Sequence, residues 1–380
     1  MNICIITEYF PETEKLEIRG GVEARAYHIA SQLAKRHTVY VITSSEHEDQ
    51  KQYKLSGINV IVCSKHAYTH EGALFSRLRF AWRAYKIWKM LQKKDIHIVD
   101  GYNYISYLPA YFLGKKLGAK RVATYHEVWL GSWIKNKGLL TGLFGALWEW
   151  IVLHCRWDAL IAVSAFTKEK LQQHIADGHV KVVPNGIAPE LYTHQYKKCA
   201  KPTICCISRL TPHKRIDDLL QAVAIIKEHI PHIQCKIIGV GNELHALQQL
   251  AKELKIEKHI EFVGFVKHHA DVIKMLKQSH VLCHPSIVEG FGLVLLESMA
   301  SHIPYVCADI PVLRETTSNG TGGLLAEPKN PAHLATQLLT LLQDAEYAEE
   351  KAHDGFALAQ QYTWEAQAVK VEKIYKMVEL

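Results

Sequence analysis

Residues 284–309 read HPSIVEGFGLVLLESMASHIPYVCAD. An apolar strand pattern ends in this stretch, two glycines around Phe291 form a turn, a helical pattern starts near Leu293, and PYVCAD has the composition of another strand. A strand, a helix and a second strand in this order predict a βαβ unit, and therefore a parallel sheet covered on both faces. Glu289 and Glu297 stand on either side of the turn, and their placement calls for a chemical reason.

The same alternation of strands and helices continues outward along the chain. Strand patterns in the first half are NICIIT, TVYVIT, IHIVD, KRVATYH, DALIAVS and KVVPNG, and those in the second half are TICCIS, QCKIIGV, IEFVGF, HVLCHPS and PYVCAD. A chain of 380 residues is too long for one ordinary core. We therefore predict two doubly wound α/β domains, at 1–186 and 203–362, joined by a polar linker at 187–202. The default ligand site of this architecture is a cleft between the domains, at the carboxyl ends of the strands.

Composition narrows the class of protein. The chain is 48% hydrophobic and 22% charged, which is typical of a globular protein, and it has no run of 18 apolar residues that could span a membrane. The start, MNICIITEYF, resembles a first strand more than a signal peptide, and the nine cysteines never form Cys-x-x-Cys. We expect a cytoplasmic protein with free thiols and neither a disulfide framework nor a zinc site. The net charge of +7 is compatible with a nucleic acid, an anionic membrane or a phosphorylated ligand.

Two cations in the second half favour the phosphorylated ligand. Arg209 and Lys214 flank the loop after TICCIS, and a guanidinium fork beside a lysine suits a diphosphate, although solvated surface charges are the alternative. Gly290 and Gly292 would let backbone N–H groups approach a ligand, and the positive end of the following helix would face it. Glu289 would then meet neutral hydroxyls and Glu297 a ribose, rather than serving as a cap and a surface residue of the helix.

These segments resemble a known family, the retaining glycosyltransferases of family 4. The resemblance rests on the Glu-x7-Glu segment 289–297, SRL…K, IIGVGNE, FVGFV, VSAFTKE, VVPNGI and the terminal YTWEAQAVKVEKIY, so it covers nearly the whole chain. It implies the GT-B fold, with two Rossmann-like domains whose parallel sheets face an interdomain cleft. It also implies an acceptor-binding first domain, a nucleotide-sugar-binding second domain, and a last helix at 363–380 that joins the first domain.

The resemblance also implies roles for individual residues. It implies that Arg209 and Lys214 bind the donor diphosphate, Glu297 the ribose, and Glu289 hydroxyls of the transferred sugar. His126, in VATYHEVW, would contact the sugar or leaving group without being an obligatory base. The catalytic set is then His126, Glu289, Arg209 and Lys214. The rest of the implied donor site is the loop Gly20 and Gly21 over the phosphate, the backbone at Phe291, Gly292 and Leu293, and the base-bordering segment Val263, Gly264 and Phe265.

A basic helix pattern at 77–94 points to the acceptor. These residues hold seven Lys and Arg and no acid, with apolar side chains on one arc and all cations except Arg77 on the other. A core helix with solvated charges is one interpretation, and peripheral binding to an anionic membrane is the other. The aromatic-rich stretch 129–157 could be a second interfacial element or core helix. We therefore expect a glycan or lipid-linked acceptor at the cytoplasmic membrane face, and no nucleic acid.

The implied reaction moves a hexose-type sugar from a UDP- or GDP-sugar to a hydroxyl, with retention. No Asp-x-Asp occurs in the chain, and protein cations with a helix N-terminus can stabilise a leaving diphosphate. We therefore expect no metal and no cofactor. The alternatives are a nucleotide-sugar epimerase of the same fold, a transferase with a soluble acceptor, and a non-catalytic sugar-nucleotide binder.

Overall fold

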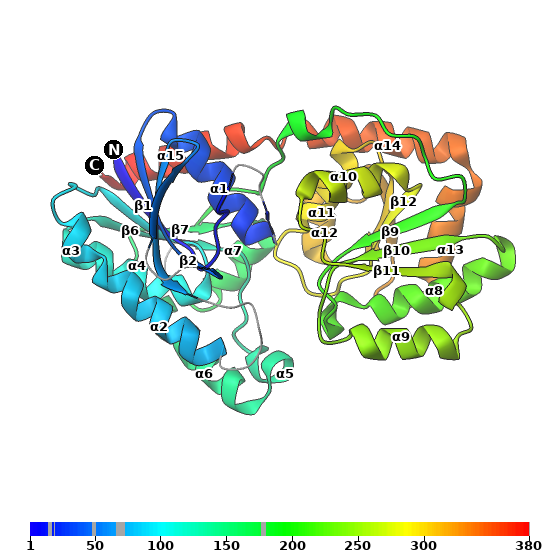
Figure 1. The fold of residues 1–380 in the computed structure, drawn as a ribbon, viewed down its shortest axis with the longest axis horizontal. Helices are drawn as coiled ribbons and strands as arrows, with labels where there is room; N and C mark the ends of the chain where they lie inside the picture. Colours follow the sequence, from blue (N-terminus) through cyan, green and yellow to red (C-terminus); the bar gives the residue numbers. More distant parts are fainter. Residues whose placement is uncertain (14–16, 19, 48–50, 66–72, 176–179, 380) are drawn as a thin grey trace. The chain divides into compact units, whose positions relative to one another are not determined.

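The computed structural model describes residues 1–13, 17–18, 20–47, 51–65, 73–175 and 180–379. The chain forms two compact units (Figure 1). The first unit is Met1–Asn185 together with Trp364–Leu380, and the second is Gly186–Thr363. Each unit has one largely parallel sheet with helices on its faces, which confirms the predicted fold class.

The first unit holds an eight-stranded sheet in the order β3-β4-β2-β1-β5-β6-β7-β8. The inner strands are apolar and buried on both faces, as expected where helices cover both sides. The strands are β1 (Asn2–Ile6), β2 (Thr38–Ser45), β3 (Lys51–Leu55), β4 (Ile58–Lys65), β5 (Ile98–Gly101), β6 (Lys120–Tyr125), β7 (Ala159–Ala162) and β8 (Val180–Val182). The helices are α1 (Gly21–Ala34), α2 (Ala73–Lys86), α3 (Trp88–Leu91), α4 (Tyr104–Leu117), α5 (Trp133–Lys137), α6 (Leu139–Leu153), α7 (Ala165–Gln172) and α15 (Trp364–Glu379).

One edge of the sheet in this unit is antiparallel. β3 and β4 form an antiparallel hairpin, which the strand prediction missed. Ser56 and Gly57 make its turn, with φ of 48° and 80°. Two positive φ values at the centre of a two-residue turn match the right-handed twist of the flanking strands.

The second unit holds a six-stranded, wholly parallel sheet in the order β11-β10-β9-β12-β13-β14. The strands are β9 (Thr203–Ile207), β10 (Gln234–Ile238), β11 (Ile260–Gly264), β12 (Val281–His284), β13 (Tyr305–Ala308) and β14 (Gly323–Ala326), of which the prediction missed β14. The α-helices are α8 (Ile216–His229), α9 (Leu244–Glu253), α10 (His269–Gln278), α11 (Leu293–Ala300), α12 (Pro311–Thr316), α13 (Pro331–Gln343) and α14 (Ala345–Ala359). Short 3₁₀ helices are η1 (Pro189–Tyr192), η2 (Pro212–Lys214) and η3 (Glu257–His259).

Residues 187–202 are not the separate linker that their polar composition predicted. They belong to the second unit and pack along the end of α10. The Lys277 ammonium donates to the carbonyl oxygens of Tyr192 and His194, at 2.6 and 2.8 Å. The Lys198 ammonium donates to the carbonyl oxygen of Ser279 at 2.6 Å. These three hydrogen bonds hold the polar segment against the end of α10, because lysine ammonium groups satisfy backbone carbonyl groups there.

The last helix, α15, packs on the first unit beside α1, although the two lie at opposite ends of the sequence (Figure 1). The rings of His28 and Trp364 stack with centroids 5.2 Å apart, and the Tyr375 hydroxyl donates to the buried Asp100 carboxylate at 2.7 Å. The N- and C-termini consequently lie at the same end of this unit.

The basic segment 77–94 is broken near Ile87 into α2 and α3 rather than forming one continuous helix. Its apolar arc enters the core as expected, since Phe80, Ala84 and Leu91 are buried. Arg77, which fell outside the predicted polar arc, is partly buried and donates to Glu8 at 2.9 Å.

Candidate active site

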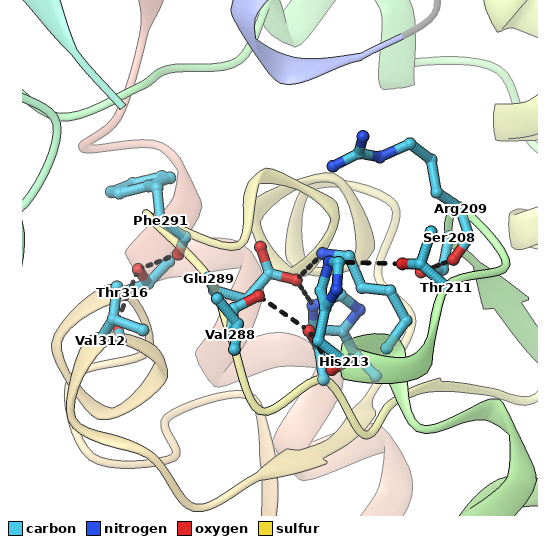
Figure 2. Close-up of polar contacts among 12 residues, drawn as sticks. Ser208, Arg209, Thr211, His213, Val288, Glu289, Phe291, Val312 and Thr316 are labelled. Atoms are coloured by element: carbon cyan, nitrogen blue, oxygen red, sulfur yellow. Dashed lines mark hydrogen bonds and ion pairs between the residues drawn. The ribbon is translucent and has the colours of Figure 1, made fainter. Parts of the chain in front are cut away.

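Glu289 is the centre of a compact charged cluster in the second unit (Figure 2). His284 ends β12, and its Nε2 lies 2.8 Å from Oε1 of Glu289. The ammonium of Lys214, the last residue of η2, donates to the same oxygen. Because a carboxylate only accepts hydrogen bonds, His284 must donate from Nε2. Sequence reasoning missed His284; its position at the end of a strand, five residues before Glu289, was the available signal.

The charge state of Glu289 follows from these two partners. Its side chain is only 12% exposed, and burial by itself would raise the pKa of this carboxyl. The Lys214 ammonium and His284 outweigh burial and hold the pKa of Glu289 well below its usual range. At neutral pH the site therefore presents an ionised carboxylate, one oxygen of which is held by the protein.

The backbone joins the two loops that carry this cluster. The N–H of Ile287 donates to the carbonyl oxygen of His213 at 3.0 Å, and the Ser286 hydroxyl reaches the same oxygen at 3.4 Å. Lys214 is thus fixed relative to Glu289 by main chain as well as by charge. Lys214, expected to bind a diphosphate, is bound first to a carboxylate of its own chain.

Arg209 follows the carboxyl end of β9, and its side chain is exposed. Figure 2 shows it extending from the loop without a dashed line to its guanidinium. Among the residues that the structure describes, no hydrogen bond or ion pair to this guanidinium is present, so its donors are available. The cluster around Glu289 and the free fork of Arg209 come from neighbouring strands, β12 and β9.

The loop that carries Arg209 packs against the turn that follows β10. A Cβ on Gly239 would lie 1.9 Å from the carbonyl oxygen of Ser208, and one on Gly241 would lie 2.1 Å from that of Leu210. The N–H of Leu210 in turn donates to the carbonyl oxygen of Val240 at 3.0 Å. A Gly-x-Gly sequence after a strand is weak evidence of function by itself, but here it lets two loops touch through their backbones.

Helix α11 begins where the sequence predicted, immediately after Gly292. Gly292 has φ of 83°, a left-handed conformation that favours glycine, and a Cβ there would lie 2.6 Å from Leu313. The N–H of Leu295 donates to the carbonyl oxygen of Gly292 at 2.9 Å, and glycine brings no side chain to cap the N–H groups of Leu293 and Val294, so these two can donate to an anion. Phe291 is buried, and the Thr316 hydroxyl donates to its carbonyl oxygen.

Glu297, on the second turn of α11, pairs with a histidine that sequence reasoning missed. Nε2 of His269, the first residue of α10, lies 3.2 Å from Oε1 of Glu297. Burial disfavours the protonated imidazole, but the Glu297 carboxylate outweighs burial and raises the pKa of His269. The second oxygen of Glu297 remains for a hydroxyl group.

The segment 263–265 lies at the end of β11, an edge strand of the sheet. Gly264 has φ of 80°, and its carbonyl oxygen accepts from the N–H of Gly239 at 2.9 Å. Val263 is partly buried, and the ring of Phe265 is 46% exposed. Phe265 therefore offers an aromatic face next to the turn that supports Arg209.

In the first unit, the predicted loop and histidine lie around a buried arginine that sequence reasoning did not single out. Gly20 is exposed and precedes α1, which begins at Gly21. Arg25, one turn into α1, is fully buried and donates to the carbonyl oxygen of Pro184 at 2.9 Å and to Asn185 Oδ1 at 3.0 Å. Its position one turn after a double glycine was the only sequence signal.

His126 follows the carboxyl end of β6, and its Nε2 is buried without a hydrogen-bond partner among the described residues. Burial and, to a smaller extent, the positive charge of Arg25 together lower the pKa of His126 to about 3. The imidazole is therefore neutral at physiological pH. A neutral ring with an unused nitrogen can form a hydrogen bond to a hydroxyl group but cannot act as a cation.

Comparisons with known proteins agree with this architecture. A family model described as Glycosyltransferase Family 4 matches residues 19–191, and one described as Glycosyl transferases group 1 matches residues 194–358. The chain is 25% identical over 374 residues to the phosphatidylinositol N-acetylglucosaminyltransferase gpi3 subunit of Schizosaccharomyces pombe, covering 94% of this chain and 78% of that protein.

Two solved structures show the same fold. A sucrose-phosphate synthase from Thermosynechococcus elongatus has a TM-score of 0.84 at 20% identity, with 99% of this chain and 98% of that chain covered. Anabaena Alr3699/HepE, solved in complex with UDP-glucose, has a TM-score of 0.74 at 19% identity, with 98% of each chain covered.

Proposed function

Because this chain belongs to family 4 of the glycosyltransferases and has the GT-B fold, we propose that it transfers a hexose-type sugar from a UDP- or GDP-sugar, with retention of configuration. In this proposal the second unit binds the nucleotide sugar and the first unit binds the acceptor. The observation that carries it is the cluster Lys214–Glu289–His284 beside the free guanidinium of Arg209.

The donors in the second unit match a diphosphate. Lys214 has three N–H donors and gives one to Glu289, which leaves two for phosphate oxygens. Arg209 adds a planar fork, and the glycine-capped N-terminus of α11 adds backbone N–H groups. UDP-glucose is bound by Anabaena Alr3699/HepE, which shares the fold.

The carboxylates suit the neutral parts of the donor. Glu289 is ionised and keeps one oxygen for sugar hydroxyls, because Oε1 is already occupied by Lys214 and His284. Glu297 is arranged similarly, with Oε1 on His269 and its other oxygen available for ribose hydroxyls. In each case a partner fixes the carboxylate before the ligand arrives, which lowers the entropy lost on binding.

The chemical step breaks the bond between the anomeric carbon and the diphosphate oxygen, and forms a bond to an acceptor oxygen on the same face. The leaving phosphate oxygen takes the acceptor proton, so no carboxylate is required as a nucleophile. Arg209, Lys214 and the α11 N–H groups stabilise the charge that develops on the diphosphate. His126, being neutral, offers Nε2 to a substrate hydroxyl. We propose that these groups act without a metal ion.

We further propose that the acceptor is a glycan or lipid-linked molecule at the cytoplasmic membrane face. Lys86, Lys89, Lys93 and Lys94 are exposed along α2 and the segment that follows it, and α2 has no acid. Each cation near an anionic lipid surface adds about 1 kcal/mol of binding free energy. The fission-yeast relative is a phosphatidylinositol N-acetylglucosaminyltransferase subunit. No described helix is both long enough and apolar enough to cross a bilayer.

The donor site is tested by calorimetric titration of UDP, GDP and their sugars into the wild type, Arg209→Gln and Lys258→Gln. Removing a charge-assisted hydrogen bond costs about 1.5–3 kcal/mol, so Arg209→Gln should weaken binding of the preferred donor about 10- to 100-fold. Lys258 is a matched control, because it is exposed and precedes β11, at the opposite end of the parallel strands from Arg209.

Transfer is then assayed with the preferred donor and lipid-phosphate acceptors, and the product is examined for the anomeric configuration. Equal donor affinity in wild type and Arg209→Gln would refute the donor site. An inverted product would refute the retaining mechanism, and release of an epimerised nucleotide sugar without acceptor would favour the epimerase alternative.

A further inference from the structure

Helix α6 has its large apolar side chains on the outside. Leu139, Leu140, Leu143, Leu147, Trp150 and Ile151 are all exposed, Leu140 to 84%. At the 100° per residue of an α-helix, these six side chains fall within an arc of about 120°. The buried residues of the same helix are Gly142, Gly145, Glu149, Val152 and Leu153, and they occupy the opposite arc. We call the outer arc the α6 stripe.

The inner arc explains why α6 is turned this way. Its glycines let α5 lie directly against it, since a Cβ on Gly142 would be 2.5 Å from Cα of Ile134, and one on Gly145 would be 2.4 Å from the Trp133 ring. Glu149 accepts from Nε1 of Trp133 at 2.6 Å and from the N–H of Trp129 at 3.2 Å. Close packing and the hydrogen bonds of a buried carboxylate thus fix the orientation of α6. The exposure of the α6 stripe therefore follows from the packing of the opposite face of the helix.

The part of the sequence that contains α2 and α6 has an excess of positive charge. Residues 73–157, which include α2 and α6, hold fourteen Lys and Arg and four Asp and Glu. Two of those four acids, Asp100 and Glu149, are buried. Trp148 of α6 packs against the same core cluster as Phe80 and Ala84 of α2, so the two helices belong to one packed region. On α2, Phe75 and Trp82 are exposed, and the Lys86 ammonium lies 5.2 Å from the Trp82 ring.

We propose that the α6 stripe inserts into the acyl layer of an anionic membrane and, with the cations of α2, docks the first unit on the lipid surface. This inference rests on the proposed membrane acceptor and names the element that enters the lipid. An exposed apolar arc beside cations and tryptophans matches the chemistry of an anionic bilayer interface. A second copy of the chain fits less well, because pairing through this region would bring the like charges of two α2 helices together.

Helix α6 also contacts the segment that carries His126. The backbone N–H of Trp129 donates to the Glu149 carboxylate of α6, and the indole Nε1 of Trp129 donates to the Glu127 carboxylate at 2.6 Å. Glu127 directly follows His126 in the sequence. Docking through α6 therefore places the His126 loop close to the headgroup region, where the hydroxyl of a lipid-linked acceptor would be.

The test compares two double variants of the full chain. Leu140→Gln with Leu147→Gln removes apolar surface from the α6 stripe, and Val369→Gln with Met377→Gln removes similarly exposed apolar surface from α15. Binding to phosphatidylglycerol-rich and to phosphatidylcholine vesicles is measured by co-sedimentation. For each leucine replaced, the partition coefficient of the α6 variant onto vesicles should fall about tenfold. The reason is that burying one leucine side chain contributes about 1.5 kcal/mol or more, which corresponds to at least a tenfold change in an equilibrium constant. The α15 variant should bind anionic vesicles like the wild type.

Insertion depth is measured with vesicles whose acyl chains are brominated. The fluorescence of the wild type should be quenched, and Trp150→Phe should remove part of that quenching, since Trp150 lies on the stripe. Vesicle binding by the α6 variant equal to that of the wild type would overturn the proposal, as would unaltered quenching in Trp150→Phe. A lipid-free dimer that the α6 variant converts to monomer would show that a second copy occupies the stripe.

Transfer to a water-soluble acceptor separates this proposal from the proposed function. The α6 variant should keep this activity while losing vesicle binding. A wild type that binds vesicles but transfers no sugar to any acceptor would refute the transferase function and leave the lipid docking intact.

Discussion

Nε2 of His284 lies 2.8 Å from Oε1 of Glu289, and the ammonium of Lys214 contacts the same oxygen. One carboxylate oxygen is thus shared by two donors from two loops, which leaves the other oxygen to face a ligand. The energetics of this arrangement can be measured separately from catalysis.

The Lys214–Glu289 pair should behave as a coupled unit in folding. Lys214→Met leaves a buried carboxylate without its cation, and breaking a buried pair on one side costs about 3–5 kcal/mol of unfolding free energy. The double variant Lys214→Met with Glu289→Gln should recover much of this loss. A denaturant-based double-mutant cycle measures the coupling, and additive effects of the two substitutions would show that the pair contributes nothing as a pair.

Glu289 should also make the unfolding free energy depend on pH in the acid range. Its pKa is lowered in the folded state, so its contribution is present above the unfolded value near 4.5 and is lost as the pH falls below it. Unfolding free energies measured between pH 3 and 7 should therefore fall less steeply at the acid end for Glu289→Gln than for the wild type. Parallel curves for the two proteins would contradict the lowered pKa.

His126 should not titrate in the range where unperturbed histidines do. Its pKa is lowered to about 3, so the ring is neutral throughout pH 5–8. His126→Asn should lower kcat/KM about 10- to 100-fold through a lost hydrogen bond, without changing the shape of the pH profile. An inflection near pH 6.5 that is present in the wild type and absent in His126→Asn would show that the ring does change charge.

Gly145→Ala should loosen the contact between α5 and α6. The added methyl group would lie 2.4 Å from the Trp133 ring, which must move and give up its hydrogen bond to Glu149. Overpacking of this kind costs about 1–3 kcal/mol. Thermal unfolding followed by near-ultraviolet circular dichroism should show a lower Tm, while Thr141→Ala, exposed on the same helix, should not. An unchanged Tm for Gly145→Ala would mean that the helices are not in close contact.

Transfer should be insensitive to chelation if protein cations alone stabilise the leaving diphosphate. Activity is measured after dialysis against EDTA and again after Mg²⁺ or Mn²⁺ is added back. Loss of activity in EDTA with recovery on adding either ion would refute the metal-independent mechanism.

Patterns with strong local causes were readable from the sequence. The strand–turn–helix order around Gly292 predicted the start of α11, because a glycine turn before an apolar helix is a local signal. The β3–β4 hairpin and β14 were missed. The five-residue β3 is mostly polar, and β14 begins with a glycine directly after the glycine-rich stretch SNGTG, so their strand patterns are weak. The eight-residue apolar β4 did carry a readable strand pattern, which the prediction overlooked.

Partners that are distant in sequence could not be predicted from it. The contacts of Glu289 with Lys214 and of Glu297 with His269 join residues 75 and 28 positions apart. Only the folded sheet order brings those loops together. For the same reason, the sequence predicted a linker at 187–202, because it does not reveal that Lys277 donates to the carbonyl oxygens of Tyr192 and His194 in that stretch.

The buried Arg25 anchors one of the two places where the chain passes between the units. The chain leaves the first unit after Asn185, which Arg25 holds, and returns at Trp364, which stacks on His28 of the same helix. On the side of the second unit, Ile187 and Thr363 are bridged to each other. Both crossings are therefore anchored within two residues of the unit boundary, which leaves only the few backbone torsions around Gly186 and between Thr363 and Trp364 outside the anchors. On the side of the first unit, both crossings are thus held by the same helix, α1, which begins directly after Gly20.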